Sequence, residues 1–275
     1  MKTEPKFFLL AGINGAGKST FYEDRLKPLG LPFINADQIA TKIDPDNATH
    51  SDEISLKAQK MAEESRAKYL KEKKSFVSET VFSHPSKINL LKEAKQAGFL
   101  VTLIFINLPD AQLAQHRVIH RSESGGHDVP SDKIISRYPR VQENILAAKS
   151  IPDHFFAFDN NRRDRPHSFL MHLKNGLVDR VSDYQPLWAQ KMFPVEYQTN
   201  LLREIIQPKE TEIKLLLKNG KSLPDALGKT LPLLKINDCI PEALKQIEMD
   251  FKRPQLIKSK ALSELEYSSI VKRLG

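Results

Sequence analysis

The sequence predicts an α/β fold with three layers, in which a mostly parallel sheet lies between helices, followed by a helical appendage towards the C-terminus. Short apolar runs alternate with amphipathic stretches through the first two thirds of the chain, which is the pattern of strands and crossover helices. After Trp188 this pattern changes to lysine-rich helical pieces interrupted by prolines. We therefore expect one domain over residues 1–189 and a helical region over residues 190–275.

The expected elements of the first domain alternate regularly. The strands are expected over residues 6–12, 31–36, 75–81, 99–108 and 155–159, and the helices over residues 18–27, 51–73, 87–96, 111–121 and 131–149. Asn175-Gly176 lies between two alternating runs and suits a type I′ turn, so we expect a β-hairpin at the edge of the sheet. Further helices are expected over residues 209–218 and 241–251.

Length and composition are those of an ordinary folded protein. The chain has 275 residues, of which 40% are hydrophobic and 28% charged. The net charge of +8 suits either a polyanionic partner or a pocket for several phosphates. The basic residues are spread along the chain instead of forming one dense cluster, which argues against nucleic acid as the partner.

The compartment predicted by the sequence is the cytoplasm. The single cysteine, Cys239, cannot form an internal disulfide. The apolar run from Phe7 to Ala11 is too short for a signal-peptide core or a membrane span, so no membrane association is expected.

A phosphate-binding loop follows the first expected strand. Residues 12–19 read Gly-Ile-Asn-Gly-Ala-Gly-Lys-Ser and match G-x-x-x-x-G-K-[ST] at every fixed position, between a strand and a helix. In such a P-loop, backbone N–H groups point at phosphate oxygens, Lys18 reaches the β- and γ-phosphates, and the Ser19 hydroxyl binds Mg²⁺. We predict a P-loop NTPase fold that binds ATP and Mg²⁺. The predicted nucleotide contacts are Gly12, Asn14, Gly15, Ala16, Gly17, Lys18, Ser19 and Thr20.

Carboxylates at strand ends indicate which kind of P-loop protein this is. The most apolar strand ends in Asn107 without an acidic residue, which argues against a motor or a transporter ATPase. Asp37 and Glu79 follow or end two other strands and should face the phosphate crevice. A kinase needs a carboxylate that accepts the proton of the attacking hydroxyl and a group that orients the acceptor. The alternative for Asp37 is that it only caps a helix beginning at Gln38.

Positive charge surrounds a Gly-rich segment at residues 124–130. The cations on both sides of it are Arg117, Arg121, Lys133, Arg137 and Arg140. This arrangement predicts a closing lid that brings arginines onto phosphate oxygens. The alternative is a solvated basic helix face.

Together these motifs resemble the zeta-toxin family of P-loop kinases, in particular a bacterial branch labelled as predicted ATPases. The resemblance lies in residues 10–20, 35–40, 78–86, 125–130 and 137–140. It implies that Asp37 is the catalytic base and that Glu79 and Thr80 contact the acceptor. It also implies that Lys18 and Ser19 contact nucleotide and Mg²⁺.

Two arginines stabilise the transferred phosphate in the better-known toxins, and the matching residues here are Arg117 and Arg121. Arg137 or Arg140 is the alternative for one of these roles. His84 and the histidine at position 127 lie in matching motifs and are candidates for substrate contact; each is alternatively a surface or capping residue.

The resemblance further implies a UDP-linked amino sugar as the acceptor and a small antitoxin as a protein partner. The run after Glu79 differs from the glycine-containing run of the toxins, so another small metabolite with a hydroxyl group stays open as the acceptor. Two other functions also remain open. One is a polynucleotide or tRNA-directed kinase, and the other is a nucleotide-gated protein of toxin and antitoxin type without robust turnover.

Overall fold

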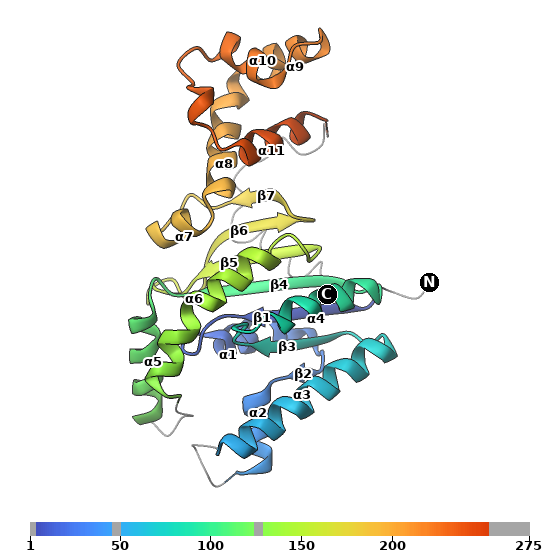
Figure 1. Ribbon diagram of the computed structural model, residues 1–275, viewed down its shortest axis with the longest axis vertical. Helices are drawn as coiled ribbons and strands as arrows, with labels where there is room; N and C mark the ends of the chain where they lie inside the picture. The colour runs from blue at the N-terminus through green and yellow to red at the C-terminus, as the bar shows by residue number, and fades with distance from the viewer. Residues whose placement is uncertain (1–3, 46–50, 124–128, 253–275) are drawn as a thin grey trace. The chain divides into compact units, whose positions relative to one another are not determined.

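The computed structural model describes residues 4–45, 51–123 and 129–252, and its elements are drawn in Figure 1. A seven-stranded sheet has the order β2-β3-β1-β4-β5-β6-β7. The neighbours from β2 to β5 pair in parallel, and β6 pairs antiparallel to β5. The strands are β1 (Lys6–Ala11), β2 (Phe33–Ile34), β3 (Phe76–Thr80), β4 (Leu100–Asn107), β5 (His154–Asp159), β6 (Ser168–Lys174) and β7 (Leu177–Val181). The predicted α/β class with a mostly parallel sheet is confirmed.

Helices connect the parallel strands. They are α1 (Lys18–Phe21), α2 (Ala36–Ile43), α3 (Asp52–Glu72), α4 (Ser86–Gln96), α5 (Ala111–Glu123) and α6 (Ser131–Ala148). Right-handed crossovers put α1 on one face of the sheet and α3, α4 and α6 on the other, and Figure 1 shows α4 and α6 together across one face. The helix expected over residues 18–27 is α-helical only at its start and continues as a π-helical turn, Tyr22–Leu26, and a 3₁₀ turn, Lys27–Leu29. Pro28 lies in that last turn and has no N–H to continue an α-helix.

The central strands are buried on both faces. In β1 every residue after Lys6 is buried, and in β4 every residue after Leu100 is buried. Such continuous apolar runs are typical of parallel strands covered by helices on both sides. Because β1, β3 and β4 run parallel, their carboxyl ends lie at the same edge of the sheet, which is where ligands bind in folds of this type.

The expected β-hairpin is present between β6 and β7. Asn175 and Gly176 have φ values of 50° and 75°, as a type I′ turn requires at its two central positions. The chain divides into two compact units, one up to Gly176 and one from Leu177 onward. The boundary expected at residue 189 stays a prediction.

The second unit contains the predicted helical region. Its helices are α7 (Leu187–Met192), α8 (Pro194–Ile206), α9 (Glu210–Lys218), α10 (Leu223–Thr230) and α11 (Pro241–Lys252). Helices α8 to α11 enclose an apolar core of their own, which includes Leu202, Ile213 and Leu227. None of the helices in the described ranges is both long enough and apolar enough to cross a membrane.

Candidate active site

The P-loop runs from the end of β1 into α1, as the sequence predicts. Gly17 is the residue before α1 and has φ 91°, a left-handed conformation that glycine adopts without strain. A Cβ atom at Gly17 would collide with the Asn160 side-chain amide, and one at Gly12 would collide with the Ile106 carbonyl oxygen. Both glycines are therefore required by close packing as well as by backbone conformation.

Several P-loop N–H groups are free to bind an anion. Within the described ranges, no hydrogen-bond acceptor takes up the N–H groups of Gly15, Gly17 and Lys18. Successive free N–H groups at a helix N-terminus form a binding site for phosphate oxygens. The residues present therefore fit the phosphates of a nucleotide.

Lys18 lies inside this loop. Its Nζ atom donates a hydrogen bond to the Ile13 carbonyl oxygen at 3.1 Å and lies 3.6 Å from Oε1 of Glu79. The side chain is buried. The P-loop ammonium and the carboxylate of β3 thus form an ion pair at the carboxyl edge of the sheet.

Glu79 is held from both sides. It lies opposite Leu10 of β1, and its Oε2 atom accepts a hydrogen bond from Asn35 Nδ2 at 2.9 Å. Burial raises the pKa of Glu79 above its ordinary value; the Lys18 charge acts in the opposite direction, and the nearby Asp37 raises the pKa further. Glu79 therefore takes up a proton more readily than an exposed carboxylate does.

This raised pKa predicts how stability depends on pH. The folded protein binds a proton at Glu79 more tightly than the unfolded chain does. The contribution of Glu79 to the free energy of unfolding should therefore fall as pH rises from the ordinary value of 4.5 through the raised folded pKa. We expect the difference between wild type and Glu79→Gln, measured by urea unfolding over this range, to shift against the wild type as pH rises. A difference that stays constant or shifts in favour of the wild type would contradict the raised pKa.

Asp37 lies near Glu79 but does not cap the helix. The N-cap of α2 is Asn35, whose Oδ1 atom accepts hydrogen bonds from the N–H groups of Asp37 and Gln38 at 2.7 and 3.1 Å. The alternative in which Asp37 caps a helix beginning at Gln38 is therefore wrong, because the helix begins two residues earlier. The Asp37 side chain is exposed, and its charge acts on the pKa of both Glu79 and Arg137.

Of the predicted arginines, Arg137 contacts the P-loop. Its Nη1 atom donates to Oδ1 of Asn14 at 3.5 Å, and burial, followed by the neighbouring charge of Arg140, lowers its pKa. Arg140 is exposed, and its Nε atom donates to the Ser136 carbonyl oxygen within α6. Arg137 thus lies beside the P-loop, and its contact with a phosphate group stays a prediction.

The arginines of α5 lie in different surroundings. Arg117 is half-buried, and burial and the Arg163 charge lower its pKa, while Asp159 at the end of β5 acts in the opposite direction. Arg121 is exposed in the last turn of α5. Their roles at the transferred phosphate stay predictions, and residues 124–128 of the expected lid, with its histidine, lie outside the described residues.

The remaining predicted residues lie at the ends of β3 and α4 and on α1. Thr80 Oγ1 accepts a hydrogen bond from the Phe82 N–H. His84 is exposed, and its Nδ1 atom accepts a hydrogen bond from the Ser86 N–H at the start of α4, which agrees with the capping alternative. Ser19 and Thr20 are exposed on the first turn of α1, so the Ser19 hydroxyl is accessible to a metal ion.

Three buried polar residues of the site were not predicted from the sequence. Asn35 positions Glu79 and caps α2, while Asn160 and His167 contact the P-loop carbonyl groups. The asparagine directly before the first helical residue is a recognised N-cap signal, so Asn35 could have been found. The other two lie far along the chain from the P-loop and carry no comparable local signal.

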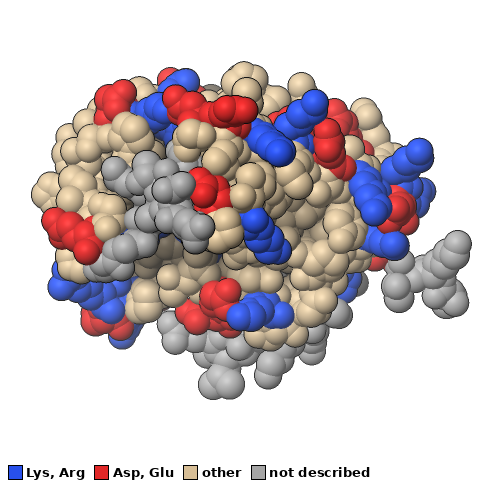
Figure 2. Space-filling view, turned by 90° about the horizontal axis from the view of Figure 1, so that it is seen from below, with Lys and Arg blue, Asp and Glu red and all other residues tan. Residues whose placement is uncertain are grey.

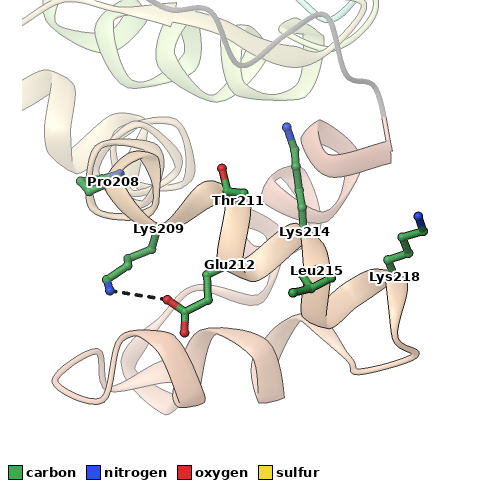
Figure 3. Close-up of a pocket in the computed structure, with 7 residues that line it drawn as sticks. All are labelled: Pro208, Lys209, Thr211, Glu212, Lys214, Leu215 and Lys218. Carbon is green, nitrogen blue, oxygen red and sulfur yellow. Dashed lines mark hydrogen bonds and ion pairs between the residues drawn. The ribbon is translucent and has the colours of Figure 1, made fainter.

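A surface pocket in the second unit does not have the features of an active site. It is formed by α9 and the preceding turn and is lined by Pro208, Lys209, Thr211, Glu212, Lys214, Leu215 and Lys218. Lys209 and Glu212 form an ion pair, while Lys214 and Lys218 extend away from Glu212 (Figure 3). Glu212, its acidic residue, is exposed and already paired with Lys209, so the pocket offers no buried charged group.

Comparison with known proteins agrees with this fold. Residues 7–137 match a family model described as an AAA domain. One chain of the crystal structure of the AvrRxo1-ORF1:-ORF2 complex superposes with a TM-score of 0.54 at 16% identity, covering 69% of this chain and 63% of that chain. The complex with ATP gives a TM-score of 0.52 at 17% identity, covering 66% of this chain and 61% of that one. This chain therefore spans less than two thirds of those structures, and at such identities the likeness shows the fold alone.

A relative at higher identity is an uncharacterized protein of Haemophilus influenzae. It is 32% identical over 136 residues, which cover 48% of this chain and 92% of the relative. The chain belongs to the same family as this Haemophilus influenzae protein, and its P-loop lies within the stretch that matches the AAA domain.

Proposed function

We propose that the protein is an ATP-dependent kinase that transfers the γ-phosphoryl group to a hydroxyl group of a small metabolite. The observation that carries this proposal is the arrangement of Lys18, Glu79 and Asp37 at one edge of the sheet. Lys18 and Glu79 form an ion pair inside the P-loop, and the exposed Asp37 carboxylate lies close enough to raise the pKa of Glu79. A P-loop with two carboxylates beside it has the groups that phosphoryl transfer to a hydroxyl requires.

Each residue has a distinct role in this proposal. The acceptor oxygen attacks the γ-phosphorus, the bond from that phosphorus to the β,γ-bridging oxygen breaks, and the hydroxyl proton passes to Asp37. We assign the role of base to Asp37 because its side chain is exposed and free to approach a hydroxyl group, whereas the Glu79 carboxylate is held by Lys18 and Asn35. Glu79 and Thr80 orient the acceptor, at the end of the strand beside the P-loop.

Positive charge stabilises the phosphate groups during transfer. Lys18 lies within the P-loop, and Arg137 reaches the same loop through Asn14. Arg117 and Arg121 are the proposed further contacts to the transferred phosphate. The Ser19 hydroxyl would hold Mg²⁺, which supplies charge neutralisation between the phosphates when it is bound.

The acceptor that we propose is the amino sugar of a UDP-linked sugar, as the resemblance to zeta toxins implies, with a small antitoxin-like protein as partner. A polynucleotide acceptor is less well supported. The face shown in Figure 2 carries acidic and basic side chains interspersed, without one continuous basic patch. A nucleic-acid kinase would need such a patch along the path of the phosphate backbone, and the coloured side chains of this one face do not form it.

A direct comparison of acceptors tests this proposal. The protein is incubated with Mg-ATP and, separately, with a UDP-linked N-acetylated amino sugar and a single-stranded oligonucleotide with a free 5′-hydroxyl. We expect ADP release and a phosphorylated product with the sugar nucleotide only. Phosphorylation of the oligonucleotide instead would overturn the acceptor class. ADP release without any phosphorylated acceptor, in these reactions and in a complete metabolite extract, would overturn kinase function.

A further inference from the structure

Two buried residues between β5 and β6 hold the carbonyl groups of the P-loop. Asn160 Nδ2 donates a hydrogen bond to the Ala16 carbonyl oxygen at 2.8 Å, and His167 Nε2 lies 3.0 Å from the Gly17 carbonyl oxygen. A carbonyl oxygen can only accept, so Nε2 of His167 is the donor. Asn160 is 8% exposed and His167 is 5% exposed, so both hydrogen bonds are shielded from water.

The two residues are themselves fixed in place. The His167 N–H donates to Oδ1 of Asn160 at 3.1 Å, and the Asn160 N–H donates to the Asn107 carbonyl oxygen at 3.0 Å. Both ends of the Asn160 side-chain amide therefore form hydrogen bonds, because Nδ2 donates to the Ala16 carbonyl oxygen and Oδ1 accepts from the His167 N–H. The imidazole ring of His167 packs edge-on against Phe21 of α1 with ring centres 5.3 Å apart.

The backbone around His167 supports the same interpretation. His167 has φ 54°, a left-handed conformation that is uncommon outside glycine and that the surrounding contacts must hold in place. Burial lowers the pKa of His167, and the hydrogen bond to the Gly17 carbonyl oxygen requires a proton on Nε2. The strained turn therefore presents a fixed donor to the P-loop.

The geometry of the peptide unit links these contacts to nucleotide binding. In a planar trans peptide the C=O and N–H bonds point in opposite directions. Holding the Ala16 carbonyl therefore directs the Gly17 N–H to the other side of the loop, and holding the Gly17 carbonyl directs the Lys18 N–H likewise. These two N–H groups are among those that no acceptor takes up in the described ranges.

We infer that Asn160 and His167 are positioning residues that orient the Gly17 and Lys18 amides of the P-loop towards the phosphate groups of the nucleotide. This inference rests on the proposed nucleotide site. It also accounts for the glycine at position 17, because the Asn160 amide lies where a Cβ atom would be.

The test measures phosphate binding separately from binding of the base. Isothermal titration calorimetry is performed with ATP, inorganic tripolyphosphate and adenosine on wild type, Asn160→Ala and His167→Leu. Asn161→Ala is the matched control, because Asn161 is the exposed neighbour of Asn160. Each substitution removes a hydrogen bond that fixes one P-loop peptide, so the N–H group of that peptide is no longer held towards the charged phosphate. ATP and tripolyphosphate should therefore both bind about 10- to 100-fold more weakly. The affinity for adenosine should be the same in all variants, and Asn161→Ala should bind all three ligands as wild type does.

A conservative variant distinguishes positioning from a general effect on folding. His167→Gln retains an amide donor that can reach the Gly17 carbonyl, so it should recover most of the tripolyphosphate affinity lost in His167→Leu. Equal binding of tripolyphosphate by wild type and the folded variants would overturn the inference, as would a loss confined to ATP, which would indicate contact with the base. If wild type binds neither ATP nor tripolyphosphate, the nucleotide site itself is overturned, which is a separate result.

Discussion

Replacing Lys18 with alanine is expected to reduce phosphoryl transfer by about 10³-fold or more, while the protein remains folded. The substitution removes the ammonium that lies inside the P-loop and would act on the β- and γ-phosphates. It also leaves Glu79 without its ion-pair partner. Because the pKa of Glu79 is already raised by burial, this carboxyl group can take up a proton instead of remaining as a buried charge.

The matched control for this experiment is Lys27→Ala. Lys27 is an exposed lysine that follows α1 closely in the chain, and its ion pair with Glu23 is on the surface. Transfer rates and circular dichroism spectra are measured for both variants. A Lys18→Ala protein that transfers phosphate at the wild-type rate would remove the P-loop from the mechanism.

Asp37→Asn should slow phosphoryl transfer by a factor of about 10² to 10⁴, because it removes the proton acceptor and keeps the shape of the side chain. Neither ATP affinity nor stability should change appreciably. Asn35, and not Asp37, accepts the hydrogen bonds at the start of α2, so the helix cap is intact in the variant.

Asp52→Asn controls for the loss of one negative charge, since Asp52 is an exposed carboxylate in the first turn of α3. Transfer is measured to the true acceptor, because background ATP hydrolysis does not require the base. If Asp37→Asn retains a rate within a few-fold of wild type, Asp37 is not the base, and Glu79 becomes the next candidate.

The sheet of this protein could be predicted well because its central strands are continuous apolar runs. The strands around Phe7 and Val101 and the Asn175-Gly176 hairpin agree with the prediction to within one or two residues. The strand expected over residues 31–36 is reduced to Phe33–Ile34, since Pro32 lacks an N–H and Asn35 already caps α2. Local sequence therefore predicts where a strand lies better than where it ends.

The candidate site could be predicted only where its chemistry is local in sequence. The P-loop is one continuous motif, and Glu79 could be predicted because a carboxylate in an apolar strand needs a partner. Asn160 and His167 contact the P-loop across 144 and 150 residues of chain. Their donors become visible only once the fold has brought the end of β5 beside the loop.

The most direct test of kinase function uses ATP labelled with ¹⁸O in the γ-phosphoryl group and a complete metabolite extract. The protein is incubated with both and Mg²⁺, and all products are searched by mass spectrometry for a new species that carries the labelled phosphoryl group. We predict one labelled phosphate ester, which is absent when Lys18→Ala replaces the wild type. Label found only in inorganic phosphate would show that water is the acceptor, and it would contradict the assignment of this protein as a kinase.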